Sequence, residues 1–181
     1  MSLPSEPRNW TREEFLISTD KSLISIATLN AVFDQDYMYW TTSFPDEVLQ
    51  KIVDASFCFG LYRARQQDAT GDETVTPEAV KGKSLEQIGF ARLATDHVTF
   101  AYLTDLYVLP EYQGRGLGGW MIDCIEEVMT PLPYLRWFTL RTSMPKSKEA
   151  YEKRLGMFVL DQGDVTKGAV MMGKKGKGNC V

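Results

Sequence analysis

Residues 102–122 read YLTDLYVLPEYQGRGLGGWMI, a stretch that joins an apolar run to a cluster of glycines. Residues 106–109 favour a buried strand, and apolar side chains recur at helical spacing from Leu117 to Val128. The glycines therefore lie where a strand leads into a helix. The first turn of that helix carries N–H groups without intrahelical partners and the positive end of the helix dipole. Because glycines let an anion approach this backbone closely, the stretch predicts a pyrophosphate-binding loop.

The glycine pattern alone leaves other kinds of loop open. Gly114, Gly116 and Gly119 also fit the Gly-x-Gly-x-x-Gly of dinucleotide-binding proteins. Such a loop usually belongs to an early β-α-β unit, with an acidic residue about 20 positions further on, whereas this one lies in the second half of the chain. No Gly-Lys-Ser/Thr follows the glycines, so the loop is not a Walker A loop. A glycine-rich turn without any ligand is the plainest alternative.

Residues 113–118 (QGRGLG) match Gln/Arg-x-x-Gly-x-Gly/Ala and resemble the acetyl-CoA loop of the GNAT superfamily of N-acetyltransferases. Residues 150–157 (AYEKRLGM) resemble the Tyr-Glu-Lys-Leu-Gly-Phe segment of the same family. The resemblance runs from about Phe15 to Met172. It implies an α+β fold, layered α/β/α, whose mixed central sheet of about six to seven strands splays open at the cofactor site.

The resemblance also implies how acetyl-CoA would be bound while its acetyl group is transferred to a primary amine. Loop N–H groups would bind the pyrophosphate, a strand edge would pair with the pantetheine amides, and the N–H of Val108 would stabilise the oxyanion. The implied cofactor-binding residues are Leu106, Tyr107, Val108, Gln113, Gly114, Arg115, Gly116, Leu117, Gly118 and Gly119. A non-catalytic CoA-binding module of the same fold is the alternative function.

Two side chains are candidates for proton transfer, Tyr151 and Asp105. The family pattern implies that Tyr151 protonates the departing thiolate, but Tyr151 stands four residues before Leu155 where the pattern has three, a shift of about 100° on a helix. Either Arg154 is an extra residue accommodated near the helix end, or Tyr151 is a core residue. Asp105 lies in an apolar strand, where an unpaired carboxylate is costly. It is either a general base or the partner of Arg92 across a hairpin. If the amine proton leaves through water, no side-chain base is needed.

The 181 residues predict a single domain in which residues 1–12 and 173–181 are flexible. The polar connection 63–84 is expected to be an insertion or a lid, and Asp96 is expected to form a turn. Strands are expected at 14–19, 56–62, 87–95, 98–109, 134–142, 157–160 and 169–172, and helices at 23–33, 45–53, 117–128 and 146–155.

Net charge, apolar runs and cysteine content indicate which classes of partner to expect. A net charge of −4 does not suggest nucleic-acid binding and mildly favours cationic acceptors such as amines. No apolar run approaches the roughly 20 residues that span a bilayer, and no signal peptide is seen, so we expect a cytoplasmic protein without a membrane partner. Three widely spaced cysteines form neither a metal pattern nor a disulfide framework. The acceptor, a small molecule or a peptide amine, and the choice between monomer and homodimer are not set by these patterns.

Overall fold

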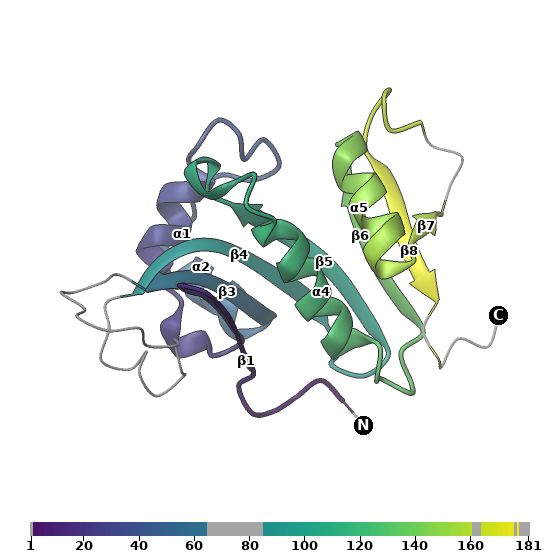
Figure 1. The fold of residues 1–181 in the computed structure, drawn as a ribbon, viewed down its shortest axis with the longest axis horizontal. Helices are drawn as coiled ribbons and strands as arrows, with labels where there is room; N and C mark the ends of the chain where they lie inside the picture. Colours follow the sequence, from purple (N-terminus) through teal and green to yellow (C-terminus); the bar gives the residue numbers. More distant parts are fainter. Residues whose placement is uncertain (1, 65–84, 161–163, 176, 178–181) are drawn as a thin grey trace. The chain divides into compact units, whose positions relative to one another are not determined.

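The computed structural model describes residues 2–64, 85–160, 164–175 and 177 of the chain. The chain divides into two compact units, Pro7–Phe90 and Met1–Glu6 with Ala91–Val181. Within the described residues the strands form one eight-stranded sheet in the order β1-β2-β3-β4-β5-β6-β8-β7, and β4 belongs to both units (Figure 1). The sequence predicted a single domain, and the structure places the division between the two units inside one strand.

The unit Pro7–Phe90 combines antiparallel strands with two short helices. Neighbouring strands β1 and β2, and β2 and β3, pair antiparallel. The predicted helix 23–33 is two elements, because Asp20 caps a 3-10 helix and the Ser25 hydroxyl then accepts the Thr28 N–H to start an α-helix. The elements are β1 (Asn9–Arg12), β2 (Phe15–Ser18), η1 (Lys21–Leu23), α1 (Ile26–Phe33), α2 (Asp46–Asp54), β3 (Phe57–Ala64) and the first part of β4 (Leu85–Thr95).

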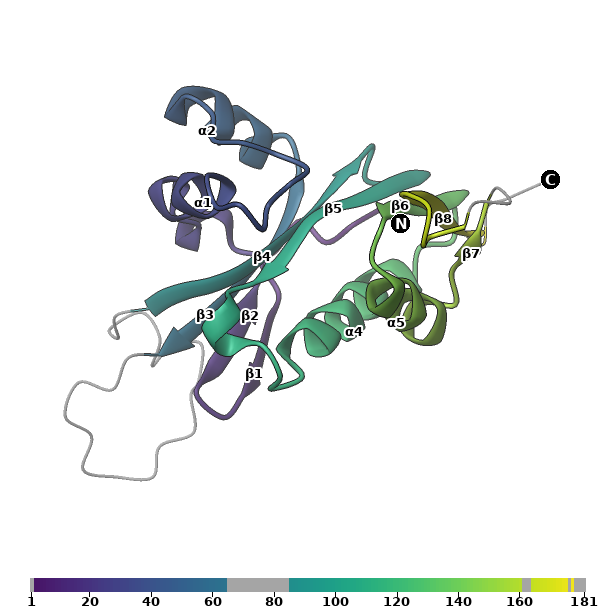
Figure 2. The ribbon, with the colours of Figure 1, turned by 90° about the horizontal axis from the view of Figure 1, so that it is seen from above.

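The second unit holds the glycine loop and the C-terminal elements. Here β5 and β6 are parallel, while β8 pairs antiparallel with both β6 and β7. Helices α4 and α5 lie side by side (Figure 2). The elements are the rest of β4, β5 (Phe100–Val108), η2 (Pro110–Tyr112), α4 (Leu117–Met129), β6 (Trp137–Thr142), α5 (Pro145–Leu155), β7 (Phe158–Val159) and β8 (Val170–Lys175).

Three expectations need correction: the flexibility of residues 9–12, the flexibility of residues 173–175, and the number of strands in the sheet. Residues 9–12 are not flexible but form β1, which hydrogen-bonds to β2 while Trp10 stacks on Phe59 at 6.2 Å. With this strand the sheet has eight strands, more than the six to seven that were predicted. Residues 173–175 are likewise ordered, because they extend β8 along β6 and Lys174 donates to Glu126 on α4. Residues 65–84 of the expected lid lie outside the described part of the chain.

The turn between β4 and β5 is built on Asp96, as predicted. Its Oδ1 accepts the N–H groups of Val98, Thr99 and Phe100 at 2.8–3.0 Å, and its Oδ2 accepts the Thr99 hydroxyl at 2.6 Å. The hydrogen bond from the Thr99 hydroxyl, together with those from the backbone, holds the pKa of Asp96 well below its ordinary value. One carboxylate thus fixes the start of β5.

No helix in residues 2–64, 85–160 or 164–175 combines the length and the apolar character that a membrane-spanning segment needs.

Replacement of Asp96 by alanine should lower the melting temperature at neutral pH, because three backbone N–H groups lose their acceptor. The folded carboxylate has a lowered pKa, so its stabilisation is present above the ordinary value of 3.8 and is lost as the pH falls further. The difference between wild type and Asp96→Ala, measured by thermal unfolding, should therefore shrink in acid. Asp96→Asn keeps an acceptor oxygen and serves as the control that does not titrate. A difference that stays constant down to acid pH would contradict this account.

Candidate active site

The glycine loop requires glycine for its backbone conformation. Gly114 and Gly116 have φ angles of 79° and 74°, in the left-handed region that other residues adopt only at a cost. A Cβ added at either position would meet no protein atom within 4 Å. These two glycines are therefore set by the turn itself, and space remains open beside them.

The first turn of α4 presents its backbone N–H groups without a capping side chain. Gly116 is the N-cap residue, and the first bond of the helix runs from the Trp120 N–H to its carbonyl. The N–H groups of residues 116–119 precede that bond, and no acidic side chain lies in the turn. Arg115 adds a cation, with its guanidinium carbon 5.7 Å from the ring centre of Tyr112. The electrostatic character of this turn favours an anion.

Gln113 makes two hydrogen bonds to the chain that precedes the loop, and its predicted contact with the cofactor stays a prediction. Its Nε2 donates to the carbonyl of Val108 at 2.9 Å, and its own N–H donates to Pro110 at 3.2 Å. A Cβ at Gly118 would lie 3.9 Å from Cγ2 of Val108, so α4 begins directly against the end of β5. The side chain of Gln113 holds the loop to the strand that precedes it.

The strand edge that the cofactor amides would use lies beyond the pairing with β6. Strands β5 and β6 pair from Phe100 with Trp137 to Leu103 with Leu140, and β5 continues to Val108. The two strands diverge past this point (Figure 1). Leu106–Val108 thus lies where the sheet opens, as the sequence predicted. The side chains of Tyr107 and Val108 are buried, whereas Leu106 is partly exposed.

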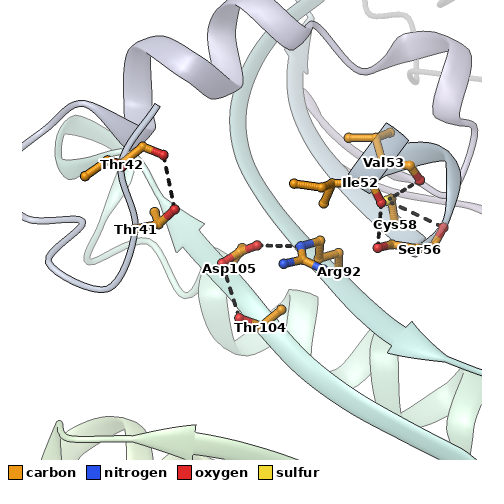
Figure 3. A network of polar contacts seen from close by, with 9 residues as sticks. All are labelled: Thr41, Thr42, Ile52, Val53, Ser56, Cys58, Arg92, Thr104 and Asp105. Atoms are coloured by element: carbon orange, nitrogen blue, oxygen red, sulfur yellow. Dashed lines mark hydrogen bonds and ion pairs between the residues drawn. The ribbon is translucent and has the colours of Figure 1, made fainter. Parts of the chain in front are cut away.

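Asp105 pairs with Arg92, one of the two alternatives drawn from the sequence. Its Oδ2 accepts Arg92 Nε at 2.5 Å, and its Oδ1 accepts the Thr104 hydroxyl at 3.2 Å (Figure 3). Asp105 is 7% exposed and has a φ of 54°, rare for a residue other than glycine. The ion pair therefore sits on an irregular residue of β5, two positions after the last pair with β6. The role of Asp105 as a general base stays a prediction.

Tyr151 is buried on α5, and its carbonyl accepts the bond that closes the end of that helix. The Gly156 N–H donates to the Tyr151 carbonyl five residues back, where an α-helix would use four, so the last turn is widened. Tyr151 and Leu155 are both buried, at 8% and 1% exposure. Burial raises the pKa of Tyr151 to about 12, so its phenol is protonated at neutral pH. A bond of this length is common where a helix ends at a left-handed glycine, and the burial of Tyr151 also fits a core residue, so both alternatives from the sequence stay open.

The guanidinium group of Arg154 lies over the backbone of Gly119. A Cβ at this position would be 2.7 Å from Nη2 and 2.8 Å from the guanidinium carbon of Arg154. Nη1 of the same side chain donates to both carboxylate oxygens of Asp123 on α4, at 2.7 and 2.6 Å. The sequence indicated no role for Asp123. Its spacing of four residues from Gly119 placed the two on one face of the helix but did not indicate that an arginine would contact both.

The sequence matches the acetyltransferase (GNAT) family over residues 32–157. The chain belongs to the GNAT family. It is 37% identical over 174 residues to the provisionally named acetyltransferase FG08082 of Gibberella zeae, with 96% of each chain covered. The GNAT chain is therefore an acyltransferase.

Solved structures give the same fold. A provisionally assigned GNAT acetyltransferase of Xanthomonas campestris pv. campestris is 31% identical, with a TM-score of 0.59 over 84% of this chain and 89% of that one. Spermidine N-acetyltransferase of Vibrio cholerae, in complex with CoA and spermine, is 14% identical, with a TM-score of 0.56 over 90% and 95%. The predicted α+β fold with a mixed sheet is confirmed.

No metal site accompanies the loop in the part of the GNAT chain that the structure describes, where no three His, Cys, Asp or Glu residues are grouped to hold an ion. The uncapped turn, the open strand edge and the buried phenol all lie in one unit. These features fit the cofactor of the family, because a pyrophosphate needs N–H donors and an amide chain needs a strand edge.

A comparison of Asp105→Asn with Asp105→Ala tests whether the Asp105 carboxylate is structural or catalytic. Both variants lose the ion pair with Arg92, but only alanine bears the full cost of the left-handed conformation, about 1–2 kcal/mol. Asp105→Ala should therefore be less stable in urea unfolding than Asp105→Asn by about 1 kcal/mol or more. The two substitutions would be equally stable if the irregular conformation were not maintained. Loss of turnover in a fully stable Asp105→Asn would instead favour the general base.

Proposed function

We propose that this GNAT acyltransferase transfers an acetyl group from acetyl-CoA to a primary amine, by direct attack in a ternary complex. The observation that carries the proposal is the uncapped first turn of α4, reached through two left-handed glycines. An anion bound there would be a pyrophosphate. The strand edge beyond Leu103 would lie alongside the chain attached to it.

The cofactor would be bound mainly by backbone groups. The N–H groups of residues 116–119 would donate to the pyrophosphate, and the pantetheine amides would pair with Leu106–Val108. Leu117 is 1% exposed, so its side chain would not contact the cofactor. The proposed cofactor-binding residues remain Leu106, Tyr107, Val108, Gln113, Gly114, Arg115, Gly116, Leu117, Gly118 and Gly119, with Gln113 acting through the loop that it holds.

The chemistry is one substitution at the thioester carbon. The amine nitrogen forms a bond to this carbon, the carbon–sulfur bond breaks, and the oxygen is negative in between. The N–H of Val108 would stabilise this oxyanion. Tyr151 would give its proton to the departing thiolate, and the amine proton would leave through water or to Asp105.

The acceptor class follows from charge and from one neighbour. A net charge of −4 favours a cationic substrate, and the Vibrio cholerae spermidine N-acetyltransferase binds spermine, a polyamine. We therefore expect a primary amine on a small molecule or a peptide. Cys58 and Cys124 are buried thiols, which supports the expected cytoplasmic location.

Acetyl-CoA at 100 times its Kd should increase the free energy of unfolding of the wild type by about 3 kcal/mol. Its melting temperature should therefore rise. Gly118→Glu should abolish this shift, because a carboxylate would take the place of the bound anion. Gly118→Ala is the matched control: Gly118 lies in α4, and its added Cβ would meet only Val108 at 3.9 Å. Differential scanning fluorimetry measures all three proteins. A wild type that no CoA ester stabilises would rule out the proposed cofactor.

Tyr151→Phe should lower kcat by about 100-fold or more, since a positioned general acid contributes about 10²–10⁴-fold. Thiol release over a panel of primary amines measures this loss and separates an enzyme from a CoA-binding module. Because burial raises the pKa of Tyr151 to about 12, the wild-type rate should not fall through loss of this donor below pH 10. A Tyr151→Phe protein with wild-type kcat would remove Tyr151 from the mechanism.

A further inference from the structure

The C-terminal end of α5 is attached to the start of α4 by one side chain, Arg154. Its Nη1 lies 2.7 and 2.6 Å from the two carboxylate oxygens of Asp123. Its Nη2 and guanidinium carbon lie against the backbone of Gly119, one helical turn before Asp123. Arginine therefore contacts α4 at two points, a carboxylate and a bare glycine.

This contact fixes geometry more than it adds stability. The side chains of Arg154 and Asp123 are 39% and 53% exposed, and exposed ion pairs contribute little to the free energy of folding. An arginine that donates to both oxygens of a carboxylate nevertheless has a defined orientation. The backbone of Gly119 limits the guanidinium further, because a Cβ added there would lie 2.7 Å from Nη2 and would displace it. The arrangement sets how α5 is rotated and placed along α4.

The residue that sets this placement is close to Tyr151 on the same helix. Arg154 follows Tyr151 by three positions, so the two side chains are neighbours on the surface of α5. Gly119 and Asp123 belong to the first two turns of α4, the helix whose N–H groups form the proposed anion site. The contact thus links the proposed proton donor to the proposed cofactor site.

In one of the two alternatives drawn from the sequence, Arg154 is the residue by which this segment exceeds the family pattern Tyr-Glu-Lys-Leu-Gly. It lies in the last turn of α5, directly before Leu155 and the left-handed Gly156. An additional residue at a helix end would by itself loosen the position of Tyr151. The bond to Asp123 offsets this, because it ties the additional residue to α4.

We propose that Arg154, bound to Asp123 and Gly119, is a positioning residue that holds Tyr151 in place relative to the first turn of α4. The proposal rests on the proposed acetyl transfer for its kinetic effect, while its geometric effect is independent of activity. Arg154 acts through α5, whereas a cation that contacted the pyrophosphate itself would act through binding.

The experiment uses the full chain labelled with 3-fluorotyrosine, with the Tyr151 resonance assigned from Tyr151→Phe. Arg154→Met and Asp123→Asn each break the contact, and Asp123→Asn leaves the positive charge in place. Gly119→Ala tests it a third way, because its Cβ displaces the guanidinium and keeps the backbone N–H. The matched control is Lys148→Met, which removes the ion pair between Lys148 and Glu152 within α5, at 2.5 Å, and leaves α4 untouched.

All three contact variants should shift or broaden the fluorine resonance of Tyr151 and lower kcat on the order of tenfold, since misplacement by 1 Å can cost about 100-fold. The KM for acetyl-CoA should stay within about twofold of the wild type, because the N–H groups of α4 are retained. Arg154→Lys keeps the charge but not the two-point bond, and should recover part of kcat. Lys148→Met should change neither readout.

An unchanged Tyr151 resonance in Arg154→Met would overturn the proposal. So would a raised KM in Arg154→Met with normal kinetics in Asp123→Asn, because Arg154 would then be a direct anion contact. A wild type that releases no thiol with any amine would instead reject the proposed acetyl transfer, and the fluorine spectra would still decide whether Arg154 positions Tyr151.

Discussion

The site depends on one constraint, that the first turn of a helix leaves its N–H groups without partners inside the helix. A protein side chain commonly caps such a turn, but Gly116 is the N-cap of α4 and no side chain replaces it. The left-handed conformations of Gly114 and Gly116 bring the chain from β5 into α4 within a few residues. Gln113 maintains this turn through its bond to Val108. The N–H groups are thereby fixed in direction before any ligand arrives.

The opening of the sheet is the second requirement, and an irregular residue of β5 lies beside it. Strands β5 and β6 start in register, and Asp105 then takes a backbone conformation that no regular strand contains. The ion pair with Arg92 and the bond from Thr104 hold that residue in place. A buried ion pair is weak evidence for stability, but it can specify one conformation over another. Here it coincides with the point where a strand edge becomes available.

Much of the fold could be predicted from residues close together in the chain. The loop 113–118, the turn at Asp96 and the stop of α5 at Gly156 follow from local backbone preferences, which do not need the rest of the chain. The strand β1 was missed because residues 9–12 have no apolar alternation and are held by pairing with β2. The break between η1 and α1 was missed because the apolar pattern continues across the caps at Asp20 and Ser25.

The sequence by itself determined the glycine turn before α4, because the spacing of its glycines and of the apolar residues after it specifies a strand, a left-handed loop and a helix start. The sequence named Arg92 as one possible partner of Asp105, and the tertiary structure showed that the pair forms. Only the tertiary structure brought Arg154 onto Gly119 and Asp123. Side chains far apart in the chain meet through packing of whole elements, and the charge of a residue does not specify which of several opposite charges it will reach. For this reason the roles of a glycine and a carboxylate in α4 became apparent only with α5 in place.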